Sequence, residues 1–341
     1  MRIIKGLENF KDLKQKRPVI VAIGTFDGVH IAHKQIIKKA VSTAARLKGL
    51  SVVLTFYPHP MRITNPDKSP ALLTSIEHRV GLISELKPDI CLIVDFRKSF
   101  AGMSPQDFID KILIEHLRAT QIVIGKNFKF GRNKSGNIKL LKTVSKKYGF
   151  TVDAIESLKS AGKIISSSFI RSLIEYGRLN AASKLLGRRF SVLGTVVKGD
   201  SRGKALGYPT ANIDPHQEAL PPNGVYAIRA KIKNKWYGGM LNIGKRPTFY
   251  RDADKFAIEV NIFNFNKYIY GQVLEIFFLK KIRNEKKFAS AKLLKDQLQR
   301  DSLRVKAILK KTYSYVGTGQ PLPQKHTEHF LFSAHDLVFE I

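Results

Sequence analysis

Cysteine is almost absent from this chain. Cys91 is the one cysteine among 341 residues, and it lies within the apolar run ICLIV. A disulfide within the chain and a zinc site built on several thiolates are therefore excluded. The apolar neighbours predict that Cys91 is a small buried side chain rather than a reactive thiol.

Long apolar runs are missing as well. No segment approaches the about 18 uninterrupted apolar residues that a membrane-spanning helix needs. The N-terminal sequence MRIIKGLENF also lacks the apolar core of a secretory signal. We therefore expect a cytoplasmic protein that makes no membrane contact.

Acidic residues are scarce, because 27 Asp and Glu stand against 59 Lys and Arg and give a formal net charge of +32. A field of this sign attracts polyanions, including nucleic acids and phosphorylated small molecules. The lysines are scattered through every segment, however, and form neither a basic tail nor a tract interleaved with aromatic residues. This distribution favours a solvated surface, so we do not expect a nucleic-acid partner; a basic nucleic-acid-binding protein is the more remote alternative.

The first half of the chain alternates between two kinds of segment, and the chain is long enough for two domains. Short runs rich in β-branched residues predict buried strands at 19–23, 51–56, 89–96 and 121–125. Amphipathic spacing predicts helices at 34–48, 76–86 and 105–117. Such alternation indicates an α/β domain with a parallel sheet that is covered on both faces.

The segment GTFDGVH follows the first predicted strand and leads into the first predicted helix. Ligands of parallel sheets bind beyond the carboxyl ends of the strands. His30 and His33 are three residues apart, which puts them on one side of the helix N-terminus, where backbone N–H groups favour an anion. The pair therefore suits a nucleotide phosphate, whereas zinc would lack further ligands. A purely structural capping role is the alternative.

The second half of the chain has the pattern of an antiparallel β domain. Runs rich in β-branched and aromatic residues predict strands at 190–200, 224–232, 235–244, 256–265 and 273–282. Short connections between them predict a small antiparallel barrel. A long amphipathic helix is predicted next, with an apolar face made of Phe288, Ala291, Leu294, Leu298, Val305, Ile308 and Leu309.

A glycine-rich loop, GDSRGKALGYPTANI, follows the first strand of this predicted barrel. Its glycines permit close approach of a phosphate, and Lys204 supplies positive charge. Thr210 and Asn212 offer hard oxygen ligands of the kind that Mg²⁺ prefers. The loop lacks the lysine–serine ending of a P-loop, so by itself it identifies no particular nucleotide fold.

The segment GTFDGVHIAH resembles the GxFDGxHxGH signature of the flavin adenylyltransferases, which belong to the nucleotidyltransferases with an HxGH motif. LTFYPHP, IGKNFKFGRNKSG and ISSSFIRSLIEYGRLNAASKLLGR match the same family in the same order. The resemblance implies a Rossmann-like nucleotidyltransferase domain over residues 1–186. It also implies transfer of AMP from ATP to FMN, which yields FAD and pyrophosphate.

The adenylyltransferase resemblance also implies roles for particular residues. His30 and His33 would hold the ATP phosphates, and three residues would meet the triphosphate from the far side of the cleft, namely Ser166, Ser167 and Arg171. The remaining residues expected to bind nucleotide or flavin are Gly24, Phe26, Asp27 and Asn127. The chemistry needs no covalent nucleophile, because positioning and charge stabilisation dominate such reactions.

The predicted barrel resembles the riboflavin kinases, whose signature is a glycine-rich flap followed by PTAN. The match continues through PPNGVYA, NIGKRPTF, EVNIFNFNKYIYG and KKIRNEKKFASAKLLKDQLQRD. It implies a kinase domain over residues 187–313, in which Thr210 and Asn212 bind Mg²⁺ and ATP phosphates. Glu259 would be the general base for the riboflavin 5′-hydroxyl, and Arg283 would lie in a loop that closes over the flavin. The flap residues expected to contact nucleotide or flavin are Gly203, Lys204 and Gly207.

Together the two resemblances cover about residues 15–313, in the order found in the bacterial bifunctional riboflavin kinase/FMN adenylyltransferase family. The implied substrates are riboflavin, FMN and ATP, with Mg²⁺ as cofactor. Ala32 and Asn127 stand where the family has glycine and aspartate, so one alternative is a riboflavin kinase with an impaired adenylyltransferase half. Residues 314–341 resemble nothing in the family and are left without a role, and whether the chain forms a homo-oligomer is left open.

Overall fold

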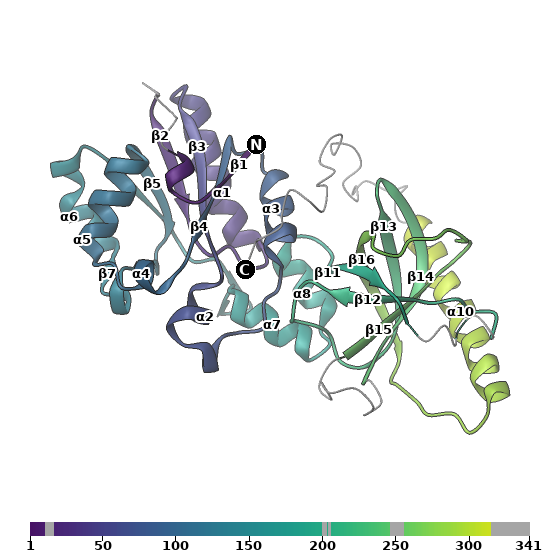
Figure 1. Ribbon diagram of the computed structural model, residues 1–341. Helices are drawn as coiled ribbons and strands as arrows, with labels where there is room; N and C mark the ends of the chain where they lie inside the picture. Colours follow the sequence, from purple (N-terminus) through teal and green to yellow (C-terminus); the bar gives the residue numbers. More distant parts are fainter. Residues whose placement is uncertain (11–16, 200–202, 204–205, 246–255, 315–341) are drawn as a thin grey trace. The chain divides into compact units, whose positions relative to one another are not determined.

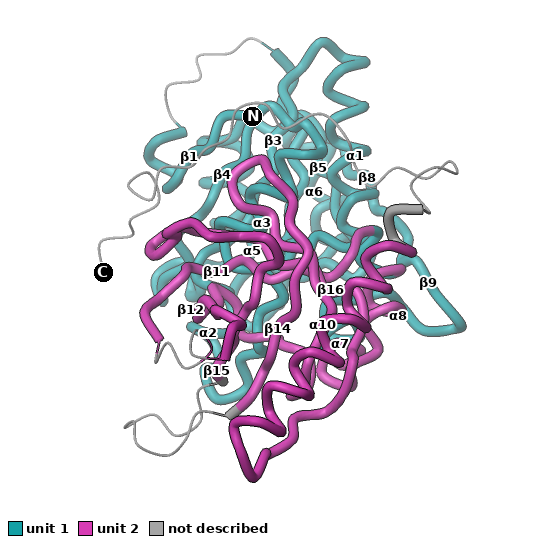
Figure 2. The backbone as a smooth tube through the Cα atoms, turned by 90° about the vertical axis from the view of Figure 1, so that its right-hand side faces the viewer, with its two compact units in different colours: residues 1–171, 185–187 teal, residues 172–184, 188–341 magenta. Residues whose placement is uncertain are grey.

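The computed structural model describes residues 1–10, 17–199, 203, 206–245 and 256–314 (Figure 1). The chain divides into two compact units, which Figure 2 colours separately. Unit 1 comprises residues 1–171 and 185–187, and unit 2 comprises residues 172–184 and 188–341. The division therefore falls within helix α7 (Ser167–Glu175) and near the end of α8 (Leu179–Leu186).

Unit 1 is built on a six-stranded sheet with the order β1-β4-β3-β2-β5-β8, in which every neighbouring pair is parallel. The strands are β1 (Arg2–Lys5), β2 (Val19–Ile23), β3 (Leu50–Tyr57), β4 (Ile90–Asp95), β5 (Ala119–Gly125) and β8 (Thr151–Ile155). The four predicted strands are confirmed as the interior of the sheet. Neither edge strand is predicted from the sequence, because both are short and only partly buried and so carry no continuous apolar run.

Helices cover this sheet as the alternating pattern predicts (Figure 1). Helix α1 (Ile31–Arg46) packs on β2, β3 and β5, α3 (Ile76–Ser84) packs on β4, and α6 (Ile138–Tyr148) packs on β8. The predicted helix at 105–117 is α5 (Pro105–Asp107) continued by a π-helical segment, η3 (Phe108–His116). The shorter elements are η1 (Glu8–Phe10), α2 (Pro60–Thr64), η2 (Pro66–Lys68), α4 (Lys98–Ala101), β6 (Lys129–Phe130), η4 (Arg132–Lys134), β7 (Gly136–Asn137), β9 (Lys159–Ser160) and β10 (Lys163–Ile164).

The strand order of this sheet contains a reversal at β2. The chain moves outward from β2 through β3 to β4, and then returns to add β5 and β8 on the other side of β2. The loops that follow β2 and β5 therefore leave the same edge of the sheet in opposite directions. Open parallel sheets bind their ligands at such a switch point.

Unit 2 contains a closed barrel with the order β11-β12-β15-β14-β13-β16, and all its pairs are antiparallel, as predicted. Its strands are β11 (Ser191–Val197), β12 (Ala211–Pro215), β13 (Gly224–Ile232), β14 (Lys235–Lys245), β15 (Phe256–Ile262) and β16 (Val273–Arg283). The residues of β12 were predicted to belong to the glycine-rich loop, and this prediction is wrong. Segment 211–215 has too few apolar residues to predict a strand. It forms one because it pairs with both β11 and β15.

Helix α10 (Ala291–Ser314) packs on β13, β14 and β16 of the barrel. Val305 and Leu309 join the buried cluster there, which confirms the apolar face predicted for this part of the helix. Phe288 was expected on the same face but lies before the helix begins. Its ring faces the Arg283 guanidinium instead, at 5.7 Å.

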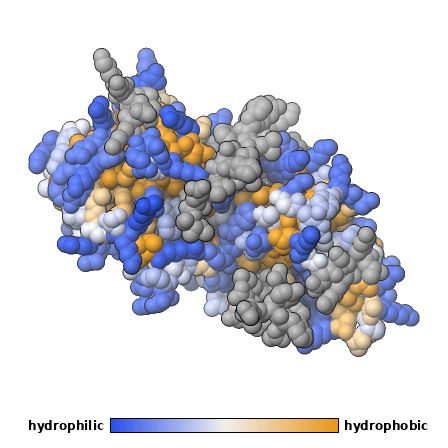
Figure 3. All heavy atoms as spheres, in the orientation of Figure 1, coloured by the Kyte–Doolittle hydropathy of each residue, from blue (hydrophilic) through white to orange (hydrophobic). Residues whose placement is uncertain are grey.

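The described residues can be compared with what the composition predicts for the surface and for the single cysteine. Hydrophilic side chains are spread over both units on the face drawn in Figure 3. Cys91 is fully buried, and its burial raises the pKa of the thiol to about 12, so it is inert as predicted. Among the helices of the described residues, none has the length and apolar character to cross a membrane.

Candidate functional site

The loop after β2 has an unusual backbone that holds the first candidate site. Phe26, Gly28 and Val29 all have positive φ angles, of 49°, 82° and 39°, although the Phe26 and Val29 side chains are fully buried. Left-handed backbone costs energy for residues other than glycine, so packing must hold these two in place. A Cβ at Gly24 would come within 2.9 Å of the Phe26 ring, which explains why glycine is needed at that position.

The two histidines predicted to bind phosphate lie against each other at the start of α1. Their rings stack with centroids 3.5 Å apart, and the Phe26 ring meets His33 edge-on at 5.3 Å. His30 is the N-cap of α1, and its Nδ1 accepts a hydrogen bond from the His33 backbone N–H (3.3 Å). An Nδ1 that accepts cannot carry the ring proton of neutral imidazole, so that proton is on Nε2.

His33 is held in its neutral form. Burial lowers its pKa well below the usual value, and repulsion from His30 and Arg79 lowers it further. Within the described residues its Nδ1 has no hydrogen-bond partner. Ala32, between the histidines, lies in the first turn of α1, where alanine is a strong helix former. The helix therefore accepts alanine at this position without strain.

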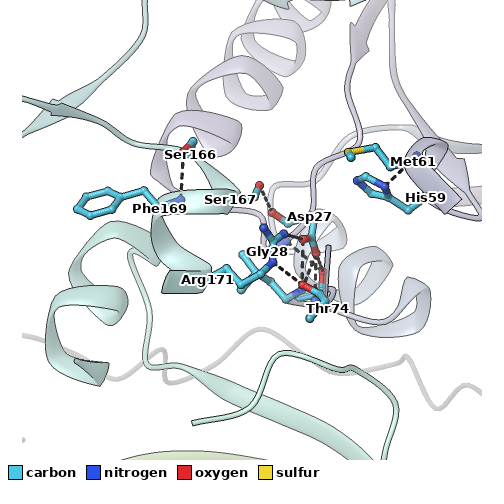
Figure 4. A network of polar contacts seen from close by, with 11 residues as sticks. Asp27, Gly28, His59, Met61, Thr74, Ser166, Ser167, Phe169 and Arg171 are labelled. Atoms are coloured by element: carbon cyan, nitrogen blue, oxygen red, sulfur yellow. Dashed lines mark hydrogen bonds and ion pairs between the residues drawn. The ribbon is translucent and has the colours of Figure 1, made fainter. Parts of the chain in front are cut away.

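A third histidine, His59, lies two residues after the end of β3, in the TFYPHP segment. It caps α2, and its Nδ1 accepts a hydrogen bond from the Met61 N–H (3.2 Å; Figure 4). The pKa of His59 is lowered to about 4, mainly by burial. Arg79 and other nearby arginines lower this pKa further, and Asp27 opposes them by raising it. His59 is therefore also neutral at pH 7, with its ring proton on Nε2.

Asp27 is the centre of a buried network in the loop after β2 (Figure 4). Its carboxylate is 1% exposed and accepts hydrogen bonds from the backbone N–H groups of Leu73 (3.0 Å) and Thr74 (3.1 Å) and from the Thr74 hydroxyl (3.2 Å). Arg171 forms an ion pair with it at 3.1 Å and also donates from Nε to the Ala71 carbonyl. The carboxylate thus fastens α7 and the 71–74 segment to the loop.

The other predicted residues of unit 1 fall into two groups. Ser167 donates to the Asp27 carbonyl (2.9 Å), while Ser166 accepts from the Phe169 N–H (3.2 Å) as a cap of α7. Both serines therefore belong to the end of α7 that meets the loop after β2. Asn127 lies on the exposed turn after β5 and donates to the Ser157 hydroxyl (3.4 Å). It shares the sheet edge with the histidines, and no hydrogen bond joins it to them among the described residues.

Replacing Asp27 with alanine tests the buried network. The change removes the carboxylate partner of the buried Arg171 guanidinium and leaves two backbone N–H groups without their acceptor, so unit 1 should lose about 3–5 kcal/mol of unfolding free energy. Urea unfolding followed by circular dichroism measures the loss, and fluorescence of Trp236, the single tryptophan, reports unit 2 separately. Asp27→Asn keeps an oxygen acceptor and should lose less. A loss below about 1 kcal/mol for Asp27→Ala would contradict the network.

The second candidate site lies on one face of the barrel in unit 2. Glu259 on β15 is directly opposite Asn212 on β12 and, on its other side, opposite Asn242 on β14. Residues directly opposite in an antiparallel ladder share a face. All three are half-buried, whereas the residues that follow them in each strand are core residues, so the three form one polar row on the face away from the core.

The PTAN segment meets this polar row where β12 begins. Thr210 lies two residues before Asn212, and the Pro209 carbonyl accepts a hydrogen bond from the Asn261 amide on β15 (2.7 Å). A Cβ at Gly199 would overlap the Asn212 amide, and one at Gly203 would come 3.1 Å from the Thr210 hydroxyl. Contact with Asn212 therefore favours glycine at position 199, whereas at position 203 the main obstacle to a Cβ is the Tyr208 carbonyl.

The remaining residues predicted for the barrel site lie around this row. Gly207 has a φ of 81°, a conformation that favours glycine. Lys204 lies outside the described residues. Arg283 forms a 2.8 Å ion pair with Asp301 of α10, which is fully buried. A Cβ at Gly244 would overlap the Glu285 carboxylate, so the segment after β16 lies against β14 near Asn242.

Several residues that the structure places in or next to these candidate sites gave no signal in the sequence. Asn242 and Asn261 are ordinary polar positions until the barrel register puts them beside Glu259 and Pro209. Arg79 lies in an amphipathic helix, where an arginine is normally solvent-facing, yet it is 1% exposed. Asp301 looks like a surface residue of α10. Only the helical spacing of the sequence could have suggested its burial, because Asp301 lies four residues before Val305 and therefore on the same face of α10.

The fold and the two polar clusters define a two-domain, nucleotide-dependent transferase. Family models agree with this division: the one described as FAD synthetase matches residues 12–169, and the one described as riboflavin kinase matches residues 186–309. The chain belongs to the bifunctional riboflavin kinase/FMN adenylyltransferase family. The activity predicted from the sequence motifs is thereby confirmed.

Relatives with that description match nearly the whole chain. The protein from Buchnera aphidicola subsp. Schizaphis graminum is 39% identical over 303 residues, 88% of this chain and 96% of its own length. That from Bacillus subtilis is 38% identical over 287 residues, covering 83% and 90%, and that from Escherichia coli K12 is 34% identical over 305 residues, covering 89% and 96%. A solved structure described as a macrolide-efflux protein from Streptococcus pneumoniae is 30% identical with a TM-score of 0.77, covering 90% of this chain and 99% of that one.

Proposed function

We propose that unit 1 transfers AMP from ATP to FMN at the switch point beyond β2 and β5, and that unit 2 phosphorylates riboflavin on the polar face of the barrel. The observation that carries this proposal is that the two sets of candidate residues lie in different units. Each set belongs to a scaffold suited to one of the two reactions. The domain limits 1–186 and 187–313 are part of the same proposal.

In the adenylyl transfer, an oxygen of the FMN phosphate bonds to the α-phosphorus of ATP. The bond from that phosphorus to the oxygen bridging the β-phosphate breaks, and pyrophosphate leaves. We assign His30 and His33 to the phosphates, where each neutral ring donates one hydrogen bond and the N-terminus of α1 adds backbone N–H donors. These donors are already oriented toward the charge that develops in the transition state, so they need not rearrange during the reaction.

We assign the α7 residues to the positioning of this loop. Arg171 is committed to the Asp27 carboxylate, and Ser167 to the Asp27 carbonyl. Together they fix the backbone that carries His30. A displacement of about 1 Å in a catalytic group can cost two orders of magnitude in rate, so such positioning has a direct effect on turnover.

In the phosphoryl transfer, Glu259 takes the proton of the riboflavin 5′-hydroxyl while that oxygen bonds to the γ-phosphorus and ADP leaves. The register of β12 and β15 supports this role, because it brings a carboxylate directly beside the Asn212 amide. Asn242 lies on the other side of Glu259 and is suited to orient its carboxylate.

The donor set of the barrel site fits Mg²⁺. Thr210, Asn212 and Glu259 all offer hard oxygen atoms, and this is the ligand chemistry that Mg²⁺ selects. We assign Thr210 and Asn212 to hold the ion. When bound, it would neutralise part of the charge on the transferred phosphoryl group. An enzyme that consumes ATP works where ATP is available, so we infer a cytoplasmic location.

Isotope-labelled ATP tests the two activities together. Incubated with riboflavin, the chain should pass label from the γ-phosphate of ATP into FMN and label from the α-phosphate into FAD only. EDTA should stop γ-label transfer, and excess Mg²⁺ should restore it. Appearance of α-label in FMN, or γ-label transfer that persists in EDTA, would contradict the proposal.

A further inference from the structure

Arg79 is a buried arginine in an unusual environment. It lies on α3, is 1% exposed, and ranks among the largest fully buried side chains of the described residues. Its hydrogen bond runs from Nη1 to the carbonyl of Phe56 (3.3 Å), while its Nε has no partner within the part of the chain that the structure describes. The nearest acidic network, around Asp27, is already paired with Arg171.

A charge in this position is expensive, because burial removes the water that would solvate it and a carbonyl is only a partial replacement. Burial is indeed the main reason that the pKa of Arg79 is lowered. The cost requires a compensating benefit. The sheet next to α3 needs no arginine for its packing, since a long apolar side chain would fill the same space without losing solvation.

The position of Arg79 in the fold suggests what the benefit is. The carbonyl that it binds belongs to Phe56, the second-last residue of β3, and His59 follows three residues later in the same TFYPHP segment. Arg79 therefore anchors the end of the strand that delivers this histidine. Its charge also acts on two histidines of the site, His33 and His59.

The hydrogen bonds of His30 and His59 require these two rings to be neutral, and burial does the same for His33. His30 and His59 each cap a helix by accepting a backbone N–H at Nδ1. A protonated imidazole has no acceptor nitrogen, so protonation would break such a cap and lose the geometry of the ring. A nearby buried cation opposes that protonation.

We infer that Arg79 is a positioning residue of the adenylyltransferase site: its guanidinium fixes the carboxyl end of β3, and its buried charge acts on His33 and His59. The inference rests on the function proposed for unit 1. It adds a residue that touches neither phosphate nor flavin and acts through the histidines.

Other charged groups also face these histidines and must be counted. His33 feels His30 as well as Arg79, and both lower its pKa. His59 is faced by Asp27, which raises its pKa, and by three arginines that lower it: Arg79, Arg171 and Arg62. Among these, Arg79 is the one that lowers the pKa of both histidines. Its removal should therefore let both take up protons at a higher pH, and activity that needs neutral imidazole should fail at a higher pH.

Two substitutions separate the charge from the hydrogen bond. Arg79→Gln keeps an amide donor and removes the charge, whereas Arg79→Lys keeps the charge and loses the planar fork. The acid limb of kcat/KM for FMN adenylylation should move up by about one pH unit in Arg79→Gln and stay near wild type in Arg79→Lys. Riboflavin phosphorylation by the same chains reports an intact unit 2, and Arg97→Gln removes an exposed arginine of unit 1 as a matched control.

Histidine NMR titration of the wild-type chain provides a readout that needs no activity. His33 and His59 should stay neutral well below pH 6.5, with His59 titrating at about 4. Ordinary titration near 6.5 would overturn the inference even if Arg79→Gln fails to fold. So would an acid limb that is unmoved in Arg79→Gln, or one that moves equally in Arg97→Gln. Absence of adenylylation in the wild type would refute the proposed function of unit 1, whereas an upward shift of the His33 and His59 titrations in Arg79→Gln relative to wild type tests Arg79 separately.

Discussion

Replacing Glu259 with glutamine is expected to lower riboflavin phosphorylation by about 10²–10⁴-fold, the usual contribution of a general base. Glutamine keeps the size of the side chain and its place in the row between Asn212 and Asn242. It cannot take the proton of the riboflavin hydroxyl. The rate of FMN formation from riboflavin, with ATP and Mg²⁺ saturating, measures the loss.

The same preparation contains its own control. FMN adenylylation by the Glu259→Gln chain should be unchanged, because unit 1 carries that reaction. Glu275→Gln is a matched substitution on β16 of the same barrel, where the carboxylate accepts a hydrogen bond from Ser191 (2.7 Å), and it should leave the kinase active. If Glu259→Gln phosphorylates riboflavin at the wild-type rate, Glu259 is not the base.

Replacing His33 with glutamine should impair the other reaction, FMN adenylylation, and leave riboflavin phosphorylation intact. FMN adenylylation is expected to fall by about 10²–10³-fold, as when one preorganised donor to a developing charge is removed. Glutamine fills part of the space beside Phe26 but cannot reproduce the stacked ring pair. FAD formation from FMN and ATP measures the effect.

Riboflavin phosphorylation by the His33→Gln chain should remain at the wild-type rate. His116→Gln changes a histidine in η3, outside the loop after β2, and should leave both reactions intact. Loss of both activities in His33→Gln would point to misfolding rather than chemistry. Undiminished FAD formation would contradict the role assigned to the histidine pair.

The elements predicted well are those whose signal is local and strong. The inner strands of unit 1 are runs of β-branched residues that are apolar on both faces, such as β2. Such a run predicts a buried strand without any information from the rest of the chain. The edge strands β1 and β8 and the barrel strand β12 are short and partly polar, so their pairing depends on neighbours that come from elsewhere in the chain. The sequence of a strand of four or five residues does not show which distant strands it pairs with.

The same distinction explains which candidate residues could be named from the sequence. His30, His33 and Glu259 could be named because sequence motifs mark them. Asp27 is also part of a sequence motif. Its hydrogen bonds to the 71–74 segment and its ion pair with Arg171, which hold the loop after β2 in place, exist only in the folded unit and could not be predicted. Arg79 was missed because its sequence context, an amphipathic helix, predicts exposure, whereas the packing of α3 on the sheet buries it.

A time course of flavin products is the most direct test that one chain carries both reactions. The purified chain is incubated with riboflavin, ATP and Mg²⁺, and the flavins are separated by chromatography. We predict that FMN forms first and is then converted to FAD, and that FAD also forms when FMN is the starting flavin. FMN without FAD would contradict the adenylyltransferase assignment and leave unit 1 without its proposed reaction, and no flavin product would contradict both assignments.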